Sequence, residues 1–580
     1  MSDYQVTTVT VSSLKDKLTL PKFQRGYVWN MTKKTELIDS LHQGFPFGSL
    51  LTYQRSVDQK EELLDGQQRW STILDFQKHK ASYYKKLEPE IYKKAFSELN
   101  SWIVSGKKIT ESDFDEITSG NEYGLADWAD EKITESGFGI KKAKDIRELI
   151  SDIKKEIDSY LKVEDLQIPI IRYTGEEGNK AQVFENLNKG GVQLTKFEIF
   201  AAAWSHTEIQ LDDSKSQKEI LNNVKQFYLN KQDKAEEYGF SLDNFSEDDF
   251  TKSKLINLFE LGVGIGRMIQ VRVPALVTDN EKNINEIGFG VLGISADIDP
   301  KRLGEIPNKL TEIERGLGGI LNKVDRISRQ LASIFNKLIQ QNTSNQNKGL
   351  VFQNALNTTY KTLSYFASLW NVETGSENEK TIISNIPVYY VRDSIDGLWG
   401  NAGDSRLFEY YNSKNVRNYE EIPDKVKFLE NFKNWIREDN TQTERFSGVV
   451  KALATIHANL TYLSDFITFN EPLQFEHIYP RARIRDVDTG KKVILGRLGN
   501  AMYLPKSLNE NKKTKTLYEL SDFEKYSSIM KESLYPEKED FEEAFKSLEV
   551  SNFGNINERI LDRSDKVAEE IVSKLLDSKF

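Results

Sequence analysis

The stretch ELLDGQQRWSTILDF, residues 62–76, decides the fold expected for the first part of the chain. Its apolar lead-in has the composition of a strand and ends at Asp65 and Gly66, and the residues after them follow a helical pattern. Residues 5–53 also contain short strand-like runs separated by turns. The pattern therefore predicts a small α/β or α+β unit in which one strand turns directly into a helix.

Polar side chains and a glycine gather at this predicted turn and in FQRGYVW, residues 23–29. They are Gln24, Arg25, Asp65, Gly66, Gln67, Gln68 and Arg69. A glycine lets the backbone approach a ligand, arginine can bind phosphate, aspartate can hold a magnesium ion, and glutamine can bond a base or a sugar. The same residues also fit a structural turn, with Asp65 near the helix N-terminus and Arg69 paired to an acid. By themselves they leave both interpretations open.

The remaining pattern divides the 580 residues into three expected domains. Residues 78–164 are polar and end in the amphipathic stretch DIRELISDIKKEIDSYL, which indicates a helical insertion in a first domain that closes near residue 210. Residues 211–440 have apolar positions every three or four residues and predict a largely helical middle domain. Within it, LGVGIGRMIQ lacks the spacing of a phosphate-binding loop, so its glycines favour packing. Residues 441–580 form the expected third domain.

Composition excludes several classes of protein. The chain has no cysteine, so disulfides, thiolate zinc sites and cysteine nucleophiles are ruled out. The start, MSDYQVTTVTVSSLKDK, lacks the basic and apolar regions of a signal peptide, and no stretch approaches the roughly 18 apolar residues that span a membrane. We therefore expect a cytoplasmic protein without membrane segments.

Two short motifs near the C-terminus suit metal-dependent cleavage of a phosphodiester. FEHIYP (residues 475–480) and LGNAMYLPKSLNEN (residues 498–511) contain Glu476, His477, Asn500 and Asn509. Carboxylate and amide oxygens bind hard divalent cations, an imidazole can take a proton from water, and an amide can orient that imidazole. Residues 476–516 also carry ten Lys and Arg against four Asp and Glu, a local charge of +6 in a chain whose formal charge is −10. By itself this excess favours a solvated, turn-rich loop face. Its coincidence with Glu476, His477, Asn500 and Asn509 instead favours nucleic acid as the partner.

These motifs together resemble a known family. FQRGYVW, LLDGQQRWSTILDF and FENLNKGGVQLTKFEIF (residues 184–200) resemble the N-terminal domain of GmrSD-type restriction nucleases, which has a ParB/sulfiredoxin-like fold. FEHIYP and LGNAMYLPKSLNEN resemble the C-terminal HNH domain of that family. The resemblance implies an α+β multidomain protein, with a helical middle and a C-terminal HNH domain of the ββα-metal type.

The resemblance also implies roles for the motif residues. Asp65, Gly66, Gln67, Gln68 and Arg69 would form a site that hydrolyses an NTP, GTP or ATP, and Gln24 and Arg25 would line the same pocket. Asn188, Gly190 and Gly191 resemble a second family turn without assigned roles. In the HNH domain, His477 would be the general base, Asn500 would position it, and Glu476 and Asn509 would bind Mg²⁺ or Mn²⁺.

The implied function is antiphage defence in bacteria. The protein would be an NTP-regulated endonuclease or nickase that acts on modified DNA, with phosphorothioate linkages or glucosylated or hydroxymethylated cytosine as the modification. The helical middle is compatible with a homodimer. A second hypothesis is an NTP-dependent DNA-binding sensor or effector whose nuclease domain is inactive, and a third is a phosphotransfer enzyme that acts on protein.

Overall fold

A computed structural model of the chain forms two compact units. Unit 1 comprises Met1–His206 and Lys225–Lys254, and unit 2 comprises Thr207–Val224 and Leu255–Phe580. The structure describes residues 4–21, 29–46, 48–54, 60–103, 108–119, 140–175, 183, 195–205, 207–237, 241–242, 245–341, 351–412, 417–438, 444–463, 472–488 and 490–577. Gln24 and Arg25, and the turn with Asn188, Gly190 and Gly191, lie outside these residues.

Unit 1 is built on a mixed six-stranded sheet with the order β1-β5-β3-β4-β2-β7. Its strands are β1 (Tyr4–Thr10), β2 (Leu18–Leu20), β3 (Leu50–Tyr53), β4 (Glu61–Asp65), β5 (Gln167–Tyr173) and β7 (Ser241–Leu242). β3 pairs antiparallel with β4 and parallel with β5. The central strands are buried on both faces because Leu50, Leu63, Leu64 and Ile170 are fully enclosed, as expected of parallel-type strands covered by helices.

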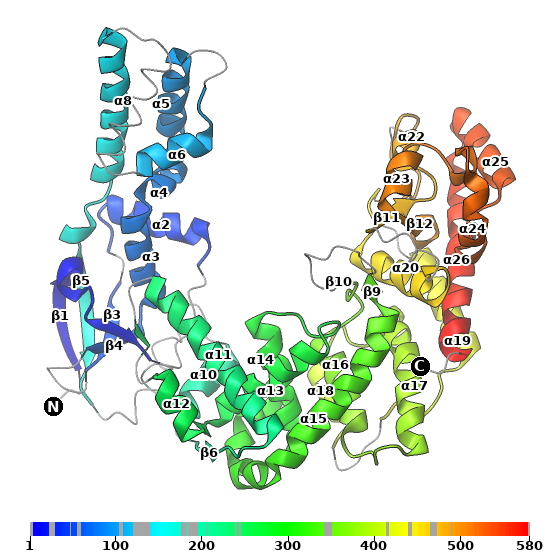
Figure 1. The fold of residues 1–580 in the computed structure, drawn as a ribbon, viewed down its shortest axis with the longest axis horizontal. Coiled ribbons are helices and arrows are strands. Elements are labelled where there is room, and N and C mark those ends of the chain that lie inside the picture. The colour runs from blue at the N-terminus through cyan, green and yellow to red at the C-terminus, as the bar shows by residue number, and fades with distance from the viewer. Residues whose placement is uncertain are drawn as a thin grey trace. The chain divides into compact units, whose positions relative to one another are not determined.

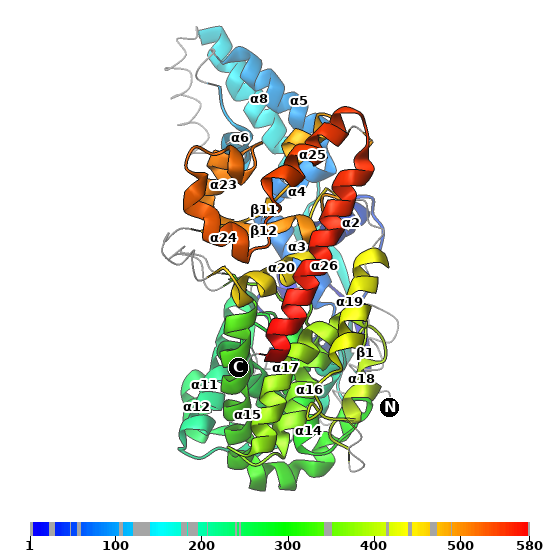
Figure 2. The same ribbon diagram turned by 90° about the vertical axis from the view of Figure 1, so that its right-hand side faces the viewer.

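The helices of unit 1 confirm the mixed α+β class expected from the sequence. They are α1 (Val11–Leu14), α2 (Met31–His42), α3 (Gln67–Lys78), α4 (Lys80–Leu87), α5 (Pro89–Trp102), α6 (Glu111–Ser119), α8 (Ile140–Ser159), α10 (Lys196–Ala203) and α12 (Glu247–Ser253). α11 (Lys215–Glu237) contributes residues to both units. The insertion is helical where it is described, and α5 and α8 lie side by side in both views (Figures 1 and 2). Ile146, Ile150, Ile153 and Ile157 of α8 share its buried face, as their helical spacing predicts.

Unit 2 is mostly helical. Its first part contains α13 (Leu258–Arg272), α14 (Glu281–Ser295), α15 (Leu310–Leu338), α16 (Thr359–Trp370), α17 (Glu377–Ile395), α18 (Gly403–Phe408), α19 (Lys425–Glu438) and α20 (Gly448–Leu460), and the short strands β6 (Ile209–Gln210), β8 (Leu255–Ile256), β9 (Gln340–Gln341) and β10 (Val351–Phe352). The glycines of LGVGIGRMIQ lie inside α13. A Cβ on Gly266 would overlap the carbonyl oxygen of Ile284 in α14, so close helix packing explains this glycine.

The last part of unit 2 is organised around a two-stranded hairpin. β11 (Leu473–His477) pairs antiparallel with β12 (Ala501–Pro505), and α23 (Lys506–Lys512) follows β12 directly. Around them lie α22 (Arg481–Arg485), α24 (Ser527–Glu532), α25 (Lys538–Glu549) and the long α26 (Phe553–Asp577), drawn in red in Figure 1. α26 passes close to the short turn Leu498–Asn500 (η5), because Gly499 has no side chain that would collide with the Ile560 carbonyl. Within the described ranges, no helix combines the length and the apolar character needed to cross a bilayer.

Candidate functional sites

The hairpin in unit 2 places the predicted nuclease residues around one strand end. Glu476 and His477 are the last two residues of β11 and lie opposite Met502 and Ala501 of β12. Neighbouring strand residues point to opposite faces. Glu476 accordingly contacts α23, whereas His477 contacts Glu444 and Phe446, which precede α20.

The surroundings of His477 define one tautomer of its imidazole. Its Nε2 lies 3.0 Å from the backbone oxygen of Glu444. A carbonyl oxygen can only accept, so Nε2 carries the proton and Nδ1 carries the lone pair. The ring stacks on Phe446 with centroids 4.1 Å apart. Burial lowers the pKa of His477 to about 4, with smaller contributions from the charges of Arg481 and Lys512. The imidazole is therefore neutral at physiological pH and able to accept a proton at Nδ1.

Asn500 is fully buried and bonds to backbone on both sides of the hairpin. Its Oδ1 accepts from the Tyr479 N–H at 2.7 Å, and its Nδ2 donates to the Leu495 carbonyl at 2.9 Å. Its own carbonyl accepts from the Ile478 N–H at 3.0 Å. The amide thus holds the turn that follows His477, and no described contact joins it to the imidazole. Any positioning of His477 by Asn500 acts through the backbone.

Lys512 is a residue of this site whose role the sequence interpretation missed. It was counted only among the basic residues of the segment, yet its side chain is fully buried at the end of α23. Its ammonium donates to Glu476 Oε1 at 2.6 Å and to the His477 carbonyl at 3.2 Å. The signal was present in the spacing, because Lys512 lies four residues after buried Leu508 and so shares its helix face.

Glu476 and Lys512 form a buried ion pair at the position expected for a metal ion. Burial raises the pKa of the Glu476 carboxyl and lowers the pKa of the Lys512 ammonium, and each partner opposes the shift of the other. Asn509 lies beside the same strand, where its Nδ2 donates to Gln474 Oε1 at 3.0 Å. Its Oδ1 then faces no described donor. One carboxylate and one amide oxygen suit a magnesium or manganese ion, which keeps several water ligands and binds through few protein oxygens.

The basic segment is less uniform than its sequence indicates. Arg497 and Lys512 are buried. Arg483 pairs with Glu519 at 3.0 Å and stacks over Phe545, and Arg485 pairs with Glu444 at 3.2 Å. Arg481 follows the FEHIYP motif, and its charge lowers the pKa of His477 more than the charge of Lys512 does.

In unit 1, the DGQQR residues occupy the predicted turn from strand to helix. β4 ends at Asp65, Gly66 adopts the left-handed backbone conformation with φ of +98°, and α3 begins at Gln67. The Arg69 guanidinium pairs with the Asp65 carboxylate at 2.9 Å. A Cβ on Gly48 would collide with this guanidinium, so two glycines flank Arg69. Gly66 is the N-cap residue of α3, so Asp65 lies one position before the cap.

The two glutamines of the motif are buried behind this turn. Gln68 Oε1 accepts from the Trp29 N–H at 3.2 Å. Gln67 is only 7% exposed, and its Oε1 has no hydrogen-bond donor in the described part of the chain. A buried acceptor without a donor is costly in a folded protein, so this oxygen is a candidate contact for a ligand. Gln24 and Arg25 fall outside the described residues.

The family comparison agrees with the geometry of unit 1. Residues 8–205 match the model of the N-terminal domain of the GmrSD restriction endonuclease. The chain therefore carries a domain of restriction endonucleases, a class of enzymes that act on DNA. More specifically, residues 8–205 form the N-terminal domain of the GmrSD type, as the motifs FQRGYVW and LLDGQQRWSTILDF indicated. The match ends before the middle and C-terminal parts of the chain. No curated protein matches the chain.

Proposed function

We propose that this chain is a metal-dependent DNA endonuclease or nickase of restriction-type defence, with an HNH-like nuclease site in unit 2. The observation that carries the proposal is the single tautomer of His477. The Glu444 carbonyl binds Nε2–H at 3.0 Å, which leaves Nδ1 as a neutral base at the last residue of β11. The β11-β12-α23 order also agrees with the ββα arrangement expected from the motif.

The proposed mechanism assigns a task to each residue of the hairpin. His477 Nδ1 takes the proton of the attacking water, while Glu444 and Phe446 keep the ring from turning. A Mg²⁺ or Mn²⁺ ion held by Glu476 and Asn509 would supply charge stabilisation for the phosphate and the leaving oxygen. Arg481 would bind a phosphate oxygen beside the imidazole. Asn500 keeps the Ile478–Tyr479 turn in place.

Cleavage by a histidine variant tests this site. We expect His477→Ala to lower the rate of plasmid nicking in Mg²⁺ by at least about 100-fold, the usual contribution of a general base. His79→Ala is the matched control, because this exposed histidine lies in unit 1, where its Nδ1 is 2.9 Å from the Asp75 carboxylate of α3. Full activity of His477→Ala would refute the proposed site.

We further propose that unit 1 has a ParB/sulfiredoxin-like fold and hydrolyses GTP or ATP to regulate cleavage. The site would comprise Asp65, Gly66, Gln67, Gln68 and Arg69, with Gln24 and Arg25 beside them. The positive φ of Gly66 and the donor-free oxygen of Gln67 support a ligand at this turn. Full NTP turnover by Asp65→Ala would contradict it. Phosphorothioated, glucosylated and unmodified DNA, each assayed with and without GTP or ATP, would identify the DNA modification.

One observation favours a second function. The Lys512 ammonium already neutralises the proposed metal ligand Glu476 at 2.6 Å. A site organised in this way would also fit an NTP-dependent DNA-binding sensor or effector with an inactive nuclease domain. DNA binding and NTP turnover without strand cleavage in Mg²⁺ or Mn²⁺ would support this second function over the first.

A further inference from the structure

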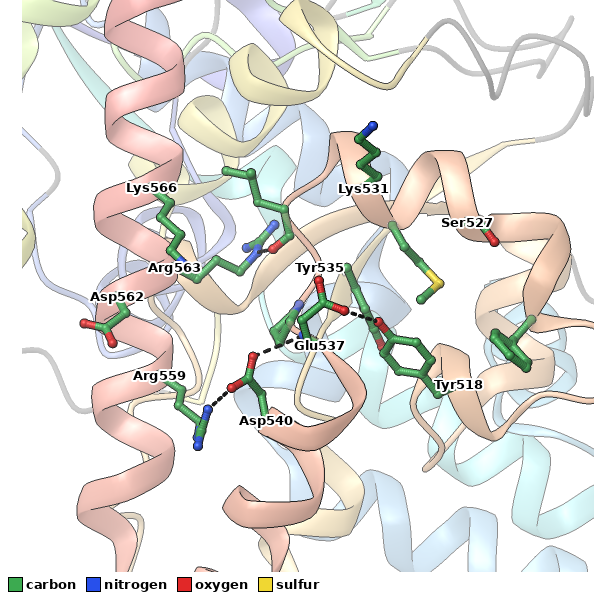
Figure 3. A pocket seen from close by; sticks show the side chains of 14 residues that line it. Tyr518, Ser527, Lys531, Tyr535, Glu537, Asp540, Arg559, Asp562, Arg563 and Lys566 are labelled. Atoms are coloured by element: carbon green, nitrogen blue, oxygen red, sulfur yellow. Dashed lines mark hydrogen bonds and ion pairs between the residues drawn. The ribbon is translucent and has the colours of Figure 1, made fainter.

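A cavity of about 540 Å³ opens in the C-terminal part of unit 2, apart from the hairpin site. Its walls come from the segment Leu517–Tyr526, from α24 and α25, and from α26 (Figure 3). Ligand sites for small molecules commonly have volumes of roughly 300–1,000 Å³. The cavity is therefore large enough for a nucleotide-sized ligand.

One wall of the cavity presents aromatic rings. Tyr518 and Phe523 are half-buried and lie with ring centroids 5.9 Å apart, and buried Tyr535 lies 6.0 Å from Tyr518. The Tyr518 hydroxyl donates to Glu537 at 3.4 Å, so its ring is held in place (Figure 3). Aromatic rings that are half-exposed and fixed in this way provide faces on which a nucleobase can stack.

The acidic groups of the cavity are largely occupied by protein partners. Asp540 pairs with Arg559, and Glu543 pairs with the same guanidinium (Figure 3 shows the first of these pairs). Glu537 accepts from Tyr518 and caps the N-terminus of α25. Asp562 is the lining acid for which no bond or ion pair is described.

Among the residues that line the cavity, four carry a positive charge and three carry a carboxylate: Lys531, Arg559, Arg563 and Lys566 against Glu537, Asp540 and Asp562. Lys531 and Lys566 are exposed at the cavity and form no ion pair with any residue that the structure describes. Arg563 lies at the buried end, where burial lowers its pKa to about 10, so it remains charged at neutral pH. Arg559 is paired with Asp540 and Glu543, so Lys531, Arg563 and Lys566 stand against two lining carboxylates without a described cationic partner, Glu537 and Asp562. This balance favours an anionic ligand such as a phosphate group.

We infer that this cavity is a second binding site, for a nucleoside phosphate whose base stacks on Tyr518 and Phe523 and whose phosphate binds Lys531 and Lys566. The same chemistry is present in a free nucleotide and in one nucleotide unit of a single-stranded nucleic acid. The inference concerns binding and does not depend on cleavage at His477.

The buried end of the cavity is joined directly to the proposed nuclease hairpin. Arg563 donates to the Leu534 carbonyl at 2.8 Å and the Ser533 carbonyl at 2.6 Å on the cavity side. It also donates to the carbonyls of Gly499 and Ala501, at 2.9 and 3.2 Å, on either side of Asn500. A ligand that moved the Ser533–Leu534 turn would thus act on the segment that pairs with His477.

Photo-crosslinking to the full chain tests the inference. The probes are 5-iodo-2′-deoxyuridine monophosphate and a six-nucleotide single strand with one 5-iodo-2′-deoxyuridine, both with EDTA so that no cleavage occurs. We expect labelled peptides that contain Tyr518 or Phe523. Labelling by the monophosphate identifies a free nucleotide as ligand, and labelling by the oligonucleotide alone identifies a nucleic-acid chain.

Matched variants separate this site from other nucleotide contacts. Lys531→Gln with Lys566→Gln should weaken the labelling about tenfold, and Phe523→Leu should lower it while it preserves apolar volume. Lys546→Gln removes an exposed lysine of α25 outside the cavity and should change nothing. The inference is overturned if neither probe labels residues 518–566, or if the lysine pair can be removed without effect. Labelling of a chain that, in a separate assay with Mg²⁺ or Mn²⁺, nicks no plasmid would overturn the proposed function alone.

Discussion

The ion pair of Glu476 and Lys512 leads to the sharpest prediction about the proposed nuclease site. We consider Lys512→Met, which keeps the length and apolar stem of the side chain and removes its ammonium. The variant leaves the Glu476 carboxylate without its cation and the His477 carbonyl without a donor. In a metal-free protein the hairpin should become less stable.

The size of the effect follows from burial. Breaking a buried ion pair by removal of one partner costs about 3–5 kcal/mol, because the remaining charge stays in the interior. The Glu476 side chain keeps 13% exposure, and burial already raises its pKa, so protonation limits the penalty. We therefore expect the free energy of local opening of the hairpin to fall by about 3 kcal/mol, the lower end of this range.

Hydrogen exchange measures this loss where it occurs. A single unfolding midpoint is not well defined for a chain of two units, whereas exchange reports each segment. Amides of β11, β12 and α23 should exchange roughly 100-fold faster in Lys512→Met, as a loss of about 3 kcal/mol requires. Magnesium on Glu476 would replace the lost charge, and at 100 times its Kd it would restore about 2.7 kcal/mol.

A neighbouring lysine provides the control. Lys513→Met removes an exposed ammonium of the same segment and should leave exchange unchanged. Equal exchange rates in Lys512→Met and Lys513→Met would show that the ion pair contributes nothing. Faster exchange that magnesium fails to reverse would contradict the assignment of Glu476 as a metal ligand.

Three further predictions concern the same unit. Gly499→Ala would place a Cβ against the Ile560 carbonyl, so it should destabilise the packing of α26 by about 1–3 kcal/mol and slow plasmid nicking. The control is Gly554→Ala at the start of α26, where a Cβ would meet the Asn552 side chain alone. This control should change neither the stability nor the nicking rate. Burial lowers the pKa of His477 to about 4, so kcat/KM for cleavage should stay level from pH 7 down to about pH 5 and fall as the pH passes through 4. A fall in kcat/KM centred near pH 6.5 would contradict the burial of this imidazole. Burial also lowers the pKa of His457, which donates to Glu570, below its usual value of 6.5. As the pH falls, His457 therefore takes up a proton in the unfolded chain at a higher pH than in the folded one. The stability measured by exchange in α20 should then fall as the pH drops below 6.5, and His457→Gln should abolish that dependence.

Much of the local structure follows from the sequence pattern. The DGQQR turn needs a residue with positive φ between a strand and a helix, and Gly66 supplies it, so the order β4, Gly66, α3 could be read from the chain. The isoleucine spacing of α8 likewise indicates its buried face, because helical periodicity depends only on residues close together in the chain. Glu476 and His477 were found as a pair because they are adjacent in the chain.

The chemistry of the candidate sites depends on contacts between distant residues. The tautomer of His477 is decided by a carbonyl 33 residues earlier, at Glu444. The partner of Glu476 is a lysine 36 residues later, and Arg563 of α26, which lines the cavity, binds carbonyls 62 and 64 residues away. The spacing of apolar residues indicates that Lys512 and Arg563 lie on the buried faces of α23 and α26. The packing of unit 2 determines which groups these two side chains contact there. The sequence by itself therefore determined the residue types and the local turns, and only the tertiary structure decided their partners, because a buried charge or imidazole acquires its properties from groups that the chain brings to it from far along its length.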